Sequence, residues 1–139
     1  MEKATERRLL QAATAIACLV PLTTGGSAIL RGVAMIRGIE PPVPIDLDSH
    51  FRYLSGLLLG IGIAFACAIP TIERRGELFR WLGVIVFIGG VGRLMSLVDV
   101  GVPGFGHRFG LAMELLVTPL IVLWQMRVAR MYGGERPRK

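Results

Sequence analysis

The chain has 139 residues, of which 53% are hydrophobic, and a formal net charge of +6. Soluble domains rarely exceed about half apolar residues, and here the excess is gathered in long uncharged runs, which argues against a soluble globular domain. The basic residues crowd the ends of these runs and form no stripe interleaved with aromatic residues, so we expect no nucleic-acid partner.

The first apolar run covers residues 9–30 and follows a short basic segment. It is one of four runs that approach or exceed the ~20 residues a helix needs to cross a bilayer. A cleaved signal peptide is the competing interpretation, but the apolar part of a signal peptide is usually only about 7–15 residues long. We therefore expect the run to be retained as a span, weakened in its second half by Pro21.

The second apolar run covers residues 51–72 and follows a proline-rich connection, residues 31–50. The prolines forbid a continuous helix through the centre of that connection. Within the run, Gly56 and Gly60 have the GxxxG spacing that lets another helix backbone approach closely. The sequence therefore predicts a second span that packs through its glycines.

The third and fourth runs, residues 81–98 and 109–126, each contain one charged residue, Arg93 and Glu114 respectively. A charge at the centre of a membrane helix costs roughly 2.5–3.5 kcal/mol on insertion scales, so it usually has a partner and a role. In the fourth run Pro119 predicts a kink. These two charges are the strongest functional signal in the chain.

The distribution of basic residues orients the predicted spans. If the four spans alternate in direction, eleven of the sixteen lysines and arginines fall on one side. The positive-inside rule then places both termini in the cytoplasm. We predict an all-α, four-helix transmembrane bundle that forms a single domain over residues 1–139. The eleven residues are Lys3, Arg7, Arg8, Arg74, Arg75, Arg80, Arg127, Arg130, Arg136, Arg138 and Lys139.

This topology puts Arg93 and Glu114 at matching depths, each roughly 8–9 Å inside the outer end of its span. Because either charge would be costly alone in a low dielectric, we expect an ion pair. Other polar residues gather at the same end, and the inner halves of the spans show nothing comparable. Beside the pair, the predicted ligand-binding residues are Arg52, Tyr53, Ser96, Asp99 and His107.

Two interpretations of this polar cluster stay open. The pair can simply fix the register of two helices, while Arg52 anchors its helix at the lipid headgroups. Alternatively, the cluster is a pocket, because the planar fork of arginine binds carboxylate and phosphate groups in a bidentate manner. No motif for a metal or a redox pair is present, so we predict no metal site and leave the cofactor unknown. Asp46, Asp48, His50 and His107 are conceivable metal ligands but have no recognised ligand spacing, and Cys18 and Cys67 form no CxxC or CxxH motif.

A family resemblance rests on three short segments. His50–Gly56 reads His-Phe-Arg-Tyr-Leu-Ser-Gly, Arg80–Gly83 reads Arg-Trp-Leu-Gly, and Gly89–Leu94 reads Gly-Gly-Val-Gly-Arg-Leu. With Glu114 in the last span, the chain resembles the small membrane proteins grouped as domain of unknown function 4345, over about residues 10–130. The resemblance implies a four-helix bacterial membrane protein and no particular reaction. Its pattern includes residues that match Arg52, Gly56, Arg93 and Glu114.

We therefore expect a multi-pass protein of the bacterial inner membrane that binds an anionic or amphipathic small molecule or lipid in a polar pocket near the outer leaflet. One alternative is a membrane enzyme, an isomerase or oxidoreductase acting on a lipid or isoprenoid, with Glu114 as general acid or base. A second alternative is an accessory subunit of a larger membrane complex. The expected partners are membrane lipids and either a second copy of the chain or a partner subunit, contacted through the glycine faces.

Overall fold

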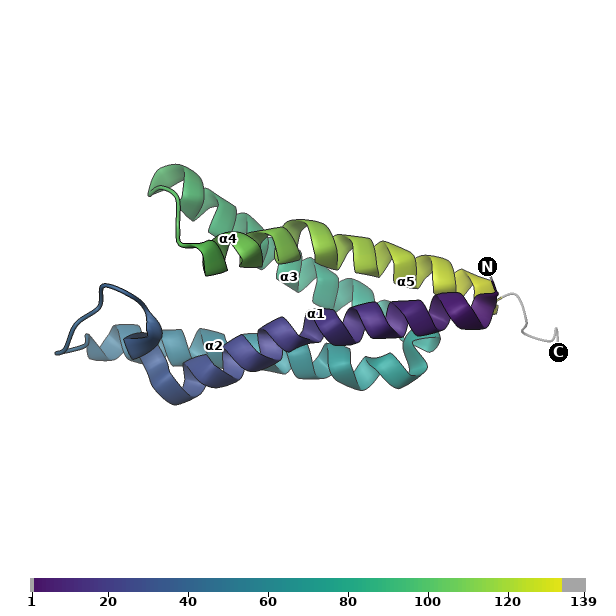
Figure 1. Ribbon diagram of the computed structural model, residues 1–139, viewed down its shortest axis with the longest axis horizontal. Helices are drawn as coiled ribbons and strands as arrows, with labels where there is room; N and C mark the ends of the chain where they lie inside the picture. Colours follow the sequence, from purple (N-terminus) through teal and green to yellow (C-terminus); the bar gives the residue numbers. More distant parts are fainter. Residues whose placement is uncertain (1, 134–139) are drawn as a thin grey trace. The chain divides into compact units, whose positions relative to one another are not determined.

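The computed structural model describes residues 2–133, and these residues form helices and no strands (Figure 1). Four helical stretches within this range are long and apolar enough to cross a membrane. The predicted all-α chain with four spans is confirmed. The elements are α1 (Lys3–Arg31), η1 (Gly32–Met35), α2 (Ile45–Ala68), η2 (Ile69–Arg74), α3 (Gly76–Asp99), α4 (Phe105–Ala112), η3 (Met113–Val117) and α5 (Thr118–Gly133).

The helices extend beyond the predicted apolar runs. An uncharged run ends at the first charged residue. The helix itself continues, because its backbone hydrogen bonds can include charged residues whose side chains reach water. Helix α1 begins at Lys3 instead of residue 9, and α5 continues to Gly133 instead of residue 126. The connection expected over residues 31–50 is correspondingly shorter, because α2 begins at Ile45. The predicted basic tail residues Arg136, Arg138 and Lys139 lie outside the described residues.

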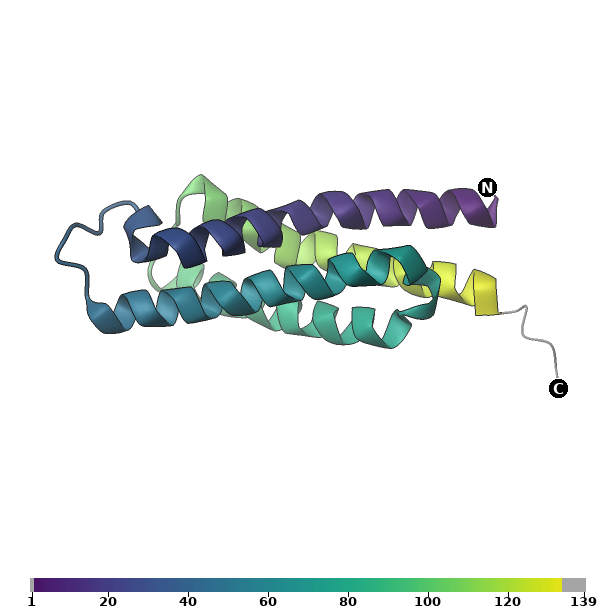
Figure 2. The ribbon, with the colours of Figure 1, turned by 90° about the horizontal axis from the view of Figure 1, so that it is seen from below.

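One compact unit comprises Ala15–Cys67, in which the second half of α1 runs beside α2 (Figure 2). The close approach is made by Gly25 of α1, where an added β-carbon would lie 2.9 Å from the backbone nitrogen of Leu59. The GxxxG pair of α2 is not at this contact. A β-carbon at Gly56 would meet only the side chain of Ile29 at 3.9 Å, and one at Gly60 would meet nothing within 4 Å.

The other compact unit joins the start of α1, up to Thr14, to the chain from Ala68 onward. Here α3 packs against the continuous helical run formed by α4, η3 and α5. Glycines of α3 permit this contact, since a β-carbon at Gly83 would lie 2.6 Å from Cγ2 of Val122. The fully buried hydrophobic side chains of this unit are Leu10, Ile72, Phe79 and Val128.

The fourth span contains a π-helical turn, η3, where the sequence predicted a proline kink. The backbone N–H of Thr118 bonds to the carbonyl of Met113, five residues earlier. Pro119 follows directly and has no N–H to offer the carbonyl one turn before it. The helix accommodates the proline by widening the preceding turn, and Glu114 lies in that widened turn. Such π-turns are frequent at functional sites.

Candidate functional site

The predicted ion pair between Arg93 of α3 and Glu114 of η3 is present. Nε of Arg93 donates to Oε2 of Glu114 at 2.9 Å, and Nη2 donates to Oε1 at 3.0 Å. This arrangement is the bidentate fork, which is stronger and more directional than a single contact. The arginine side chain is 33% exposed and the glutamate side chain 16% exposed. The two side chains of the pair are therefore only partly buried in the protein.

His107 of α4 is the third member of this site. Its Nδ1 lies 2.9 Å from Nη1 of Arg93. Because the guanidinium is always charged and can only donate, Nδ1 is the acceptor, which assigns the proton of the neutral ring to Nε2. The histidine itself is exposed. We call Arg93, Glu114 and His107 the polar triad.

Gly90 lets the carboxylate come this close. It lies three residues before Arg93 on α3, hence on the same helical face. A β-carbon at Gly90 would lie 2.9 Å from Cβ of Glu114 and 2.7 Å from Cδ2 of Leu115. The bare backbone of α3 therefore seats the widened turn η3 and holds its glutamate opposite the guanidinium.

Two further predicted residues, Ser96 and Asp99, lie on the last turns of α3. Both are exposed. The hydrogen bonds of Arg93 go to Glu114 and His107 instead. Of the predicted rim, the structure thus brings His107 to the pair, and a ligand-binding role for Ser96 and Asp99 stays a prediction.

Arg52 closes the end of α1, within the unit Ala15–Cys67. Its Nε donates to Oδ2 of Asp48 at 2.7 Å, and its Nη1 donates to the carbonyl of Ile29. Oδ1 of the same aspartate accepts the N–H of Val33 at 2.8 Å. Gly32 makes this possible with a φ of +60°, in the left-handed region. The arginine thus satisfies carbonyls that a helix end leaves unpaired.

Tyr53, the neighbour of Arg52 on α2, is 62% exposed. Its ring lies 6.3 Å from that of His50, centroid to centroid. An exposed tyrosine at the start of an apolar helix suits the membrane interface. Its predicted ligand-binding role stays a prediction.

A second polar cluster, which the sequence interpretation missed, lies in the unit that joins the start of α1 to the chain from Ala68 onward, away from the triad. Arg127 donates to Glu6 at 2.8 and 3.2 Å, although the two are 121 residues apart. Gln125 is fully buried and donates to the carbonyl of Ile72 at 2.8 Å. Gln11 donates to the carbonyl of Ile69 at 2.9 Å.

The expectation that the opposite halves of the spans hold nothing comparable to the first cluster is therefore wrong. Glu6 and Arg127 lie just outside the predicted apolar runs but inside the helices α1 and α5. Two glutamines inside apolar runs, Gln11 and Gln125, were the available signal. Buried amides need partners, and here each reaches a carbonyl of η2.

Within residues 2–133, histidine, cysteine, aspartate and glutamate side chains form no group of three or more that could hold a metal ion. Cys18 is buried and Cys67 is exposed, and both are free thiols. The polar triad combines charge, hydrogen-bonding capacity and partial exposure within two of the apolar spans.

Four apolar helices, two of them joined by an ion pair within their spans, define a multi-pass helical membrane protein. The chain belongs to the family described as a domain of unknown function (DUF4345), which matches residues 9–125. No curated protein matches the chain, and no solved structure matches it.

Proposed function

We propose that the protein binds an anionic or amphipathic small molecule or lipid at the polar triad. The proposal includes a location in the bacterial inner membrane, with both termini cytoplasmic and the triad near the outer leaflet. This orientation is supported by the eleven basic residues that share one side. The cytoplasmic leaflet carries anionic lipids, which attract basic residues to that side of the membrane.

The observation that carries the proposal is the unused hydrogen-bonding capacity of Arg93. A guanidinium has five N–H donors, and three are directed at Glu114 and His107. Two N–H groups remain on a side chain that is one-third exposed. Donors that face hydrocarbon without a partner are costly, so an oxyanion or a polar headgroup at this point would satisfy them.

A role in helix register alone explains less of the geometry. A pair that only fixes register gains from complete mutual satisfaction. Here His107 of α4, seven residues before Glu114 on the same continuous helical run, adds a ring whose Nε2–H points away from the acceptor nitrogen. The triad therefore offers donors from two side chains around one partly exposed guanidinium.

The same geometry favours binding over proton transfer by Glu114. Both carboxylate oxygens are engaged by Arg93 at 2.9 and 3.0 Å. A general base must reach the substrate proton within about 2.6–3.2 Å, and here both carboxylate oxygens already accept hydrogen bonds from the guanidinium. An enzyme acting on a lipid would have to break this pair first.

The test is native mass spectrometry of protein extracted in a mild detergent, with lipid analysis of the same sample. Wild-type protein should carry an added mass of an anionic or amphipathic molecule, and Arg93→Gln/Glu114→Gln should lose it. The matched control is Glu6→Gln/Arg127→Gln, which removes a pair of similar geometry at the other cluster. The control should keep the added mass.

Equal retention in the Arg93 and Glu114 variant would contradict the proposal. So would wild-type protein that emerges without any such molecule. Stoichiometric copurification of another membrane protein, lost on enlarging an open glycine such as Gly89 or Gly92 of α3, would favour the accessory-subunit alternative instead.

A further inference from the structure

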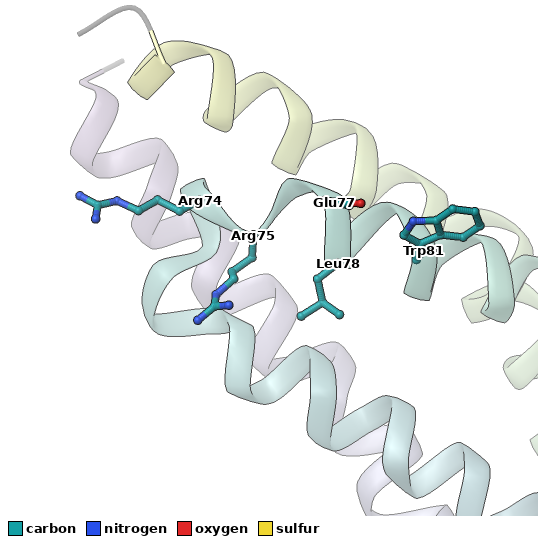
Figure 3. A pocket seen from close by; sticks show the side chains of 5 residues that line it. All are labelled: Arg74, Arg75, Glu77, Leu78 and Trp81. Carbon is teal, nitrogen blue, oxygen red and sulfur yellow. The ribbon is translucent and has the colours of Figure 1, made fainter. Parts of the chain in front are cut away.

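A hollow of about 400 Å³ lies where η2 turns into α3, far along the chain from the polar triad. Figure 3 shows the side chains around it, with the arginine pair on the connection and the aromatic ring one turn into the helix. It is lined by Arg74, Arg75, Glu77, Leu78 and Trp81. Trp81 and Arg93 are twelve residues apart on one helix, or roughly 18 Å, so the hollow is a separate feature.

The polar side of this hollow is cationic and incompletely paired. The Arg74 side chain is 83% exposed, and its contact with Glu73 is 3.9 Å long. Arg75 donates from Nε to the hydroxyl of Thr71 at 3.2 Å, which leaves both terminal nitrogens available. Glu77 is the one acidic residue of the lining. The two guanidinium groups therefore leave the hollow with a net positive charge.

The other side of the hollow is apolar and lies at the start of a membrane-spanning helix. Trp81 is 63% exposed and Leu78 is 37% exposed. Tryptophan at the end of an apolar helix is typical of the headgroup level of a bilayer. A phosphate at this level would meet arginine forks, which bind it in a bidentate manner.

An apolar groove follows on the next turns of α3. It has a volume of about 360 Å³ and is lined almost entirely by apolar side chains. Val84 of this groove is three residues after Trp81, hence on a neighbouring part of the same helical face. The remaining lining residues are Arg80, Gly83, Phe87, Pro119, Val122 and Leu123.

We propose that the start of α3 binds one anionic phospholipid, with its phosphate at Arg74 and Arg75 and an acyl chain that passes Trp81 and Val84 into the groove beside α5. The cationic hollow at headgroup level and the groove in the span match the two parts of such a molecule. A soluble phosphate would leave the groove unfilled. The proposal is independent of the function assigned to the polar triad.

The experiment uses the full chain with Trp124→Phe, so that Trp81 is the remaining tryptophan. The protein is reconstituted in phosphatidylcholine vesicles that contain increasing fractions of brominated phosphatidylglycerol or brominated phosphatidylcholine, and quenching of Trp81 fluorescence is measured. We expect the glycerol lipid to be preferred by at least about fivefold, which is the effect of one arginine near an anionic headgroup.

The variant Arg74→Gln/Arg75→Gln should bring this preference close to one. The matched control, Arg37→Gln/Arg130→Gln, removes two other exposed arginines and should leave the preference unchanged, as should Arg93→Gln/Glu114→Gln. Equal quenching by both lipids in the Trp124→Phe protein with Arg74 and Arg75 intact would overturn the proposal. Displacement of the lipid by inorganic phosphate at constant ionic strength would also overturn it.

Discussion

Removing the carboxylate of Glu114 should destabilise the protein much more than removing both members of its ion pair. Breaking a buried pair on one side costs about 3–5 kcal/mol, because it leaves a charge without a partner. Arg93 is 33% exposed and keeps its contact with His107, so we expect Glu114→Leu to lower the free energy of unfolding by about 2–3 kcal/mol. The double variant Arg93→Leu/Glu114→Leu should lie within about 1 kcal/mol of wild type.

The assay is unfolding in mixed detergent micelles with an increasing mole fraction of sodium dodecyl sulfate, followed by circular dichroism. The four proteins of the cycle are wild type, Arg93→Leu, Glu114→Leu and the double variant, which together give the coupling energy of the pair. Because each single variant leaves one charge without its partner and the double variant leaves none, we expect a coupling of at least about 2–3 kcal/mol. A coupling below about 0.5 kcal/mol would refute the argument, since each charge would then be satisfied without the other.

Three further predictions are tested by the same unfolding assay. Gly25→Ala should cost about 1–3 kcal/mol because backbone atoms must move, whereas Gly60→Ala, in open space, should be neutral or slightly stabilising; equal effects would contradict the assignment of the close approach. Gly32→Ala should cost roughly 2 kcal/mol or more, because its β-carbon would overlap the Asp48 carboxylate and its backbone is in the left-handed region. The control Gly38→Ala, with a φ of +87° and nothing near its β-carbon, should cost only the backbone strain. Glu73→Gln should be neutral or stabilising, because this 8% exposed carboxylate has contacts no shorter than 3.6 Å and an oxygen without a partner; a loss above about 1 kcal/mol would show that the charge is needed.

The spans and the central pair could be predicted because both follow from the cost of placing groups in hydrocarbon. Long apolar runs can only become helices there, and two opposite charges at equal depth on neighbouring helices have strong reason to meet. This reasoning identified Arg93 and Glu114 as partners. It did not require any knowledge of how the remaining helices pack.

The contacts that could not be predicted depend on helix rotation and on partners distant in sequence. Glu6 and Arg127 are separated by 121 residues, and nothing local indicates that their helix ends meet. The close helix approach is made by Gly25, which is not part of a GxxxG step, while the recognised step at Gly56 and Gly60 lies off the contact. Glycine spacing shows where a backbone is accessible, but the face that a helix turns to its neighbour is decided by all its side chains together.

In the polar triad, too, the charge pattern predicts which residues pair but not the geometry in which they meet. The charges of Arg93 and Glu114 specify an attraction, but a bidentate fork also requires the carboxylate plane to face the guanidinium edge at about 3 Å. Gly90 removes the side chain that would hold η3 away, and the widened turn before Pro119 carries Glu114. Neither residue bears a charge, and neither could be assigned to the site from charge patterning. Because the π-turn places the glutamate on a backbone that a regular α-helix would not provide, its position opposite Arg93 is a property of the fold around the pair and not of the pair alone.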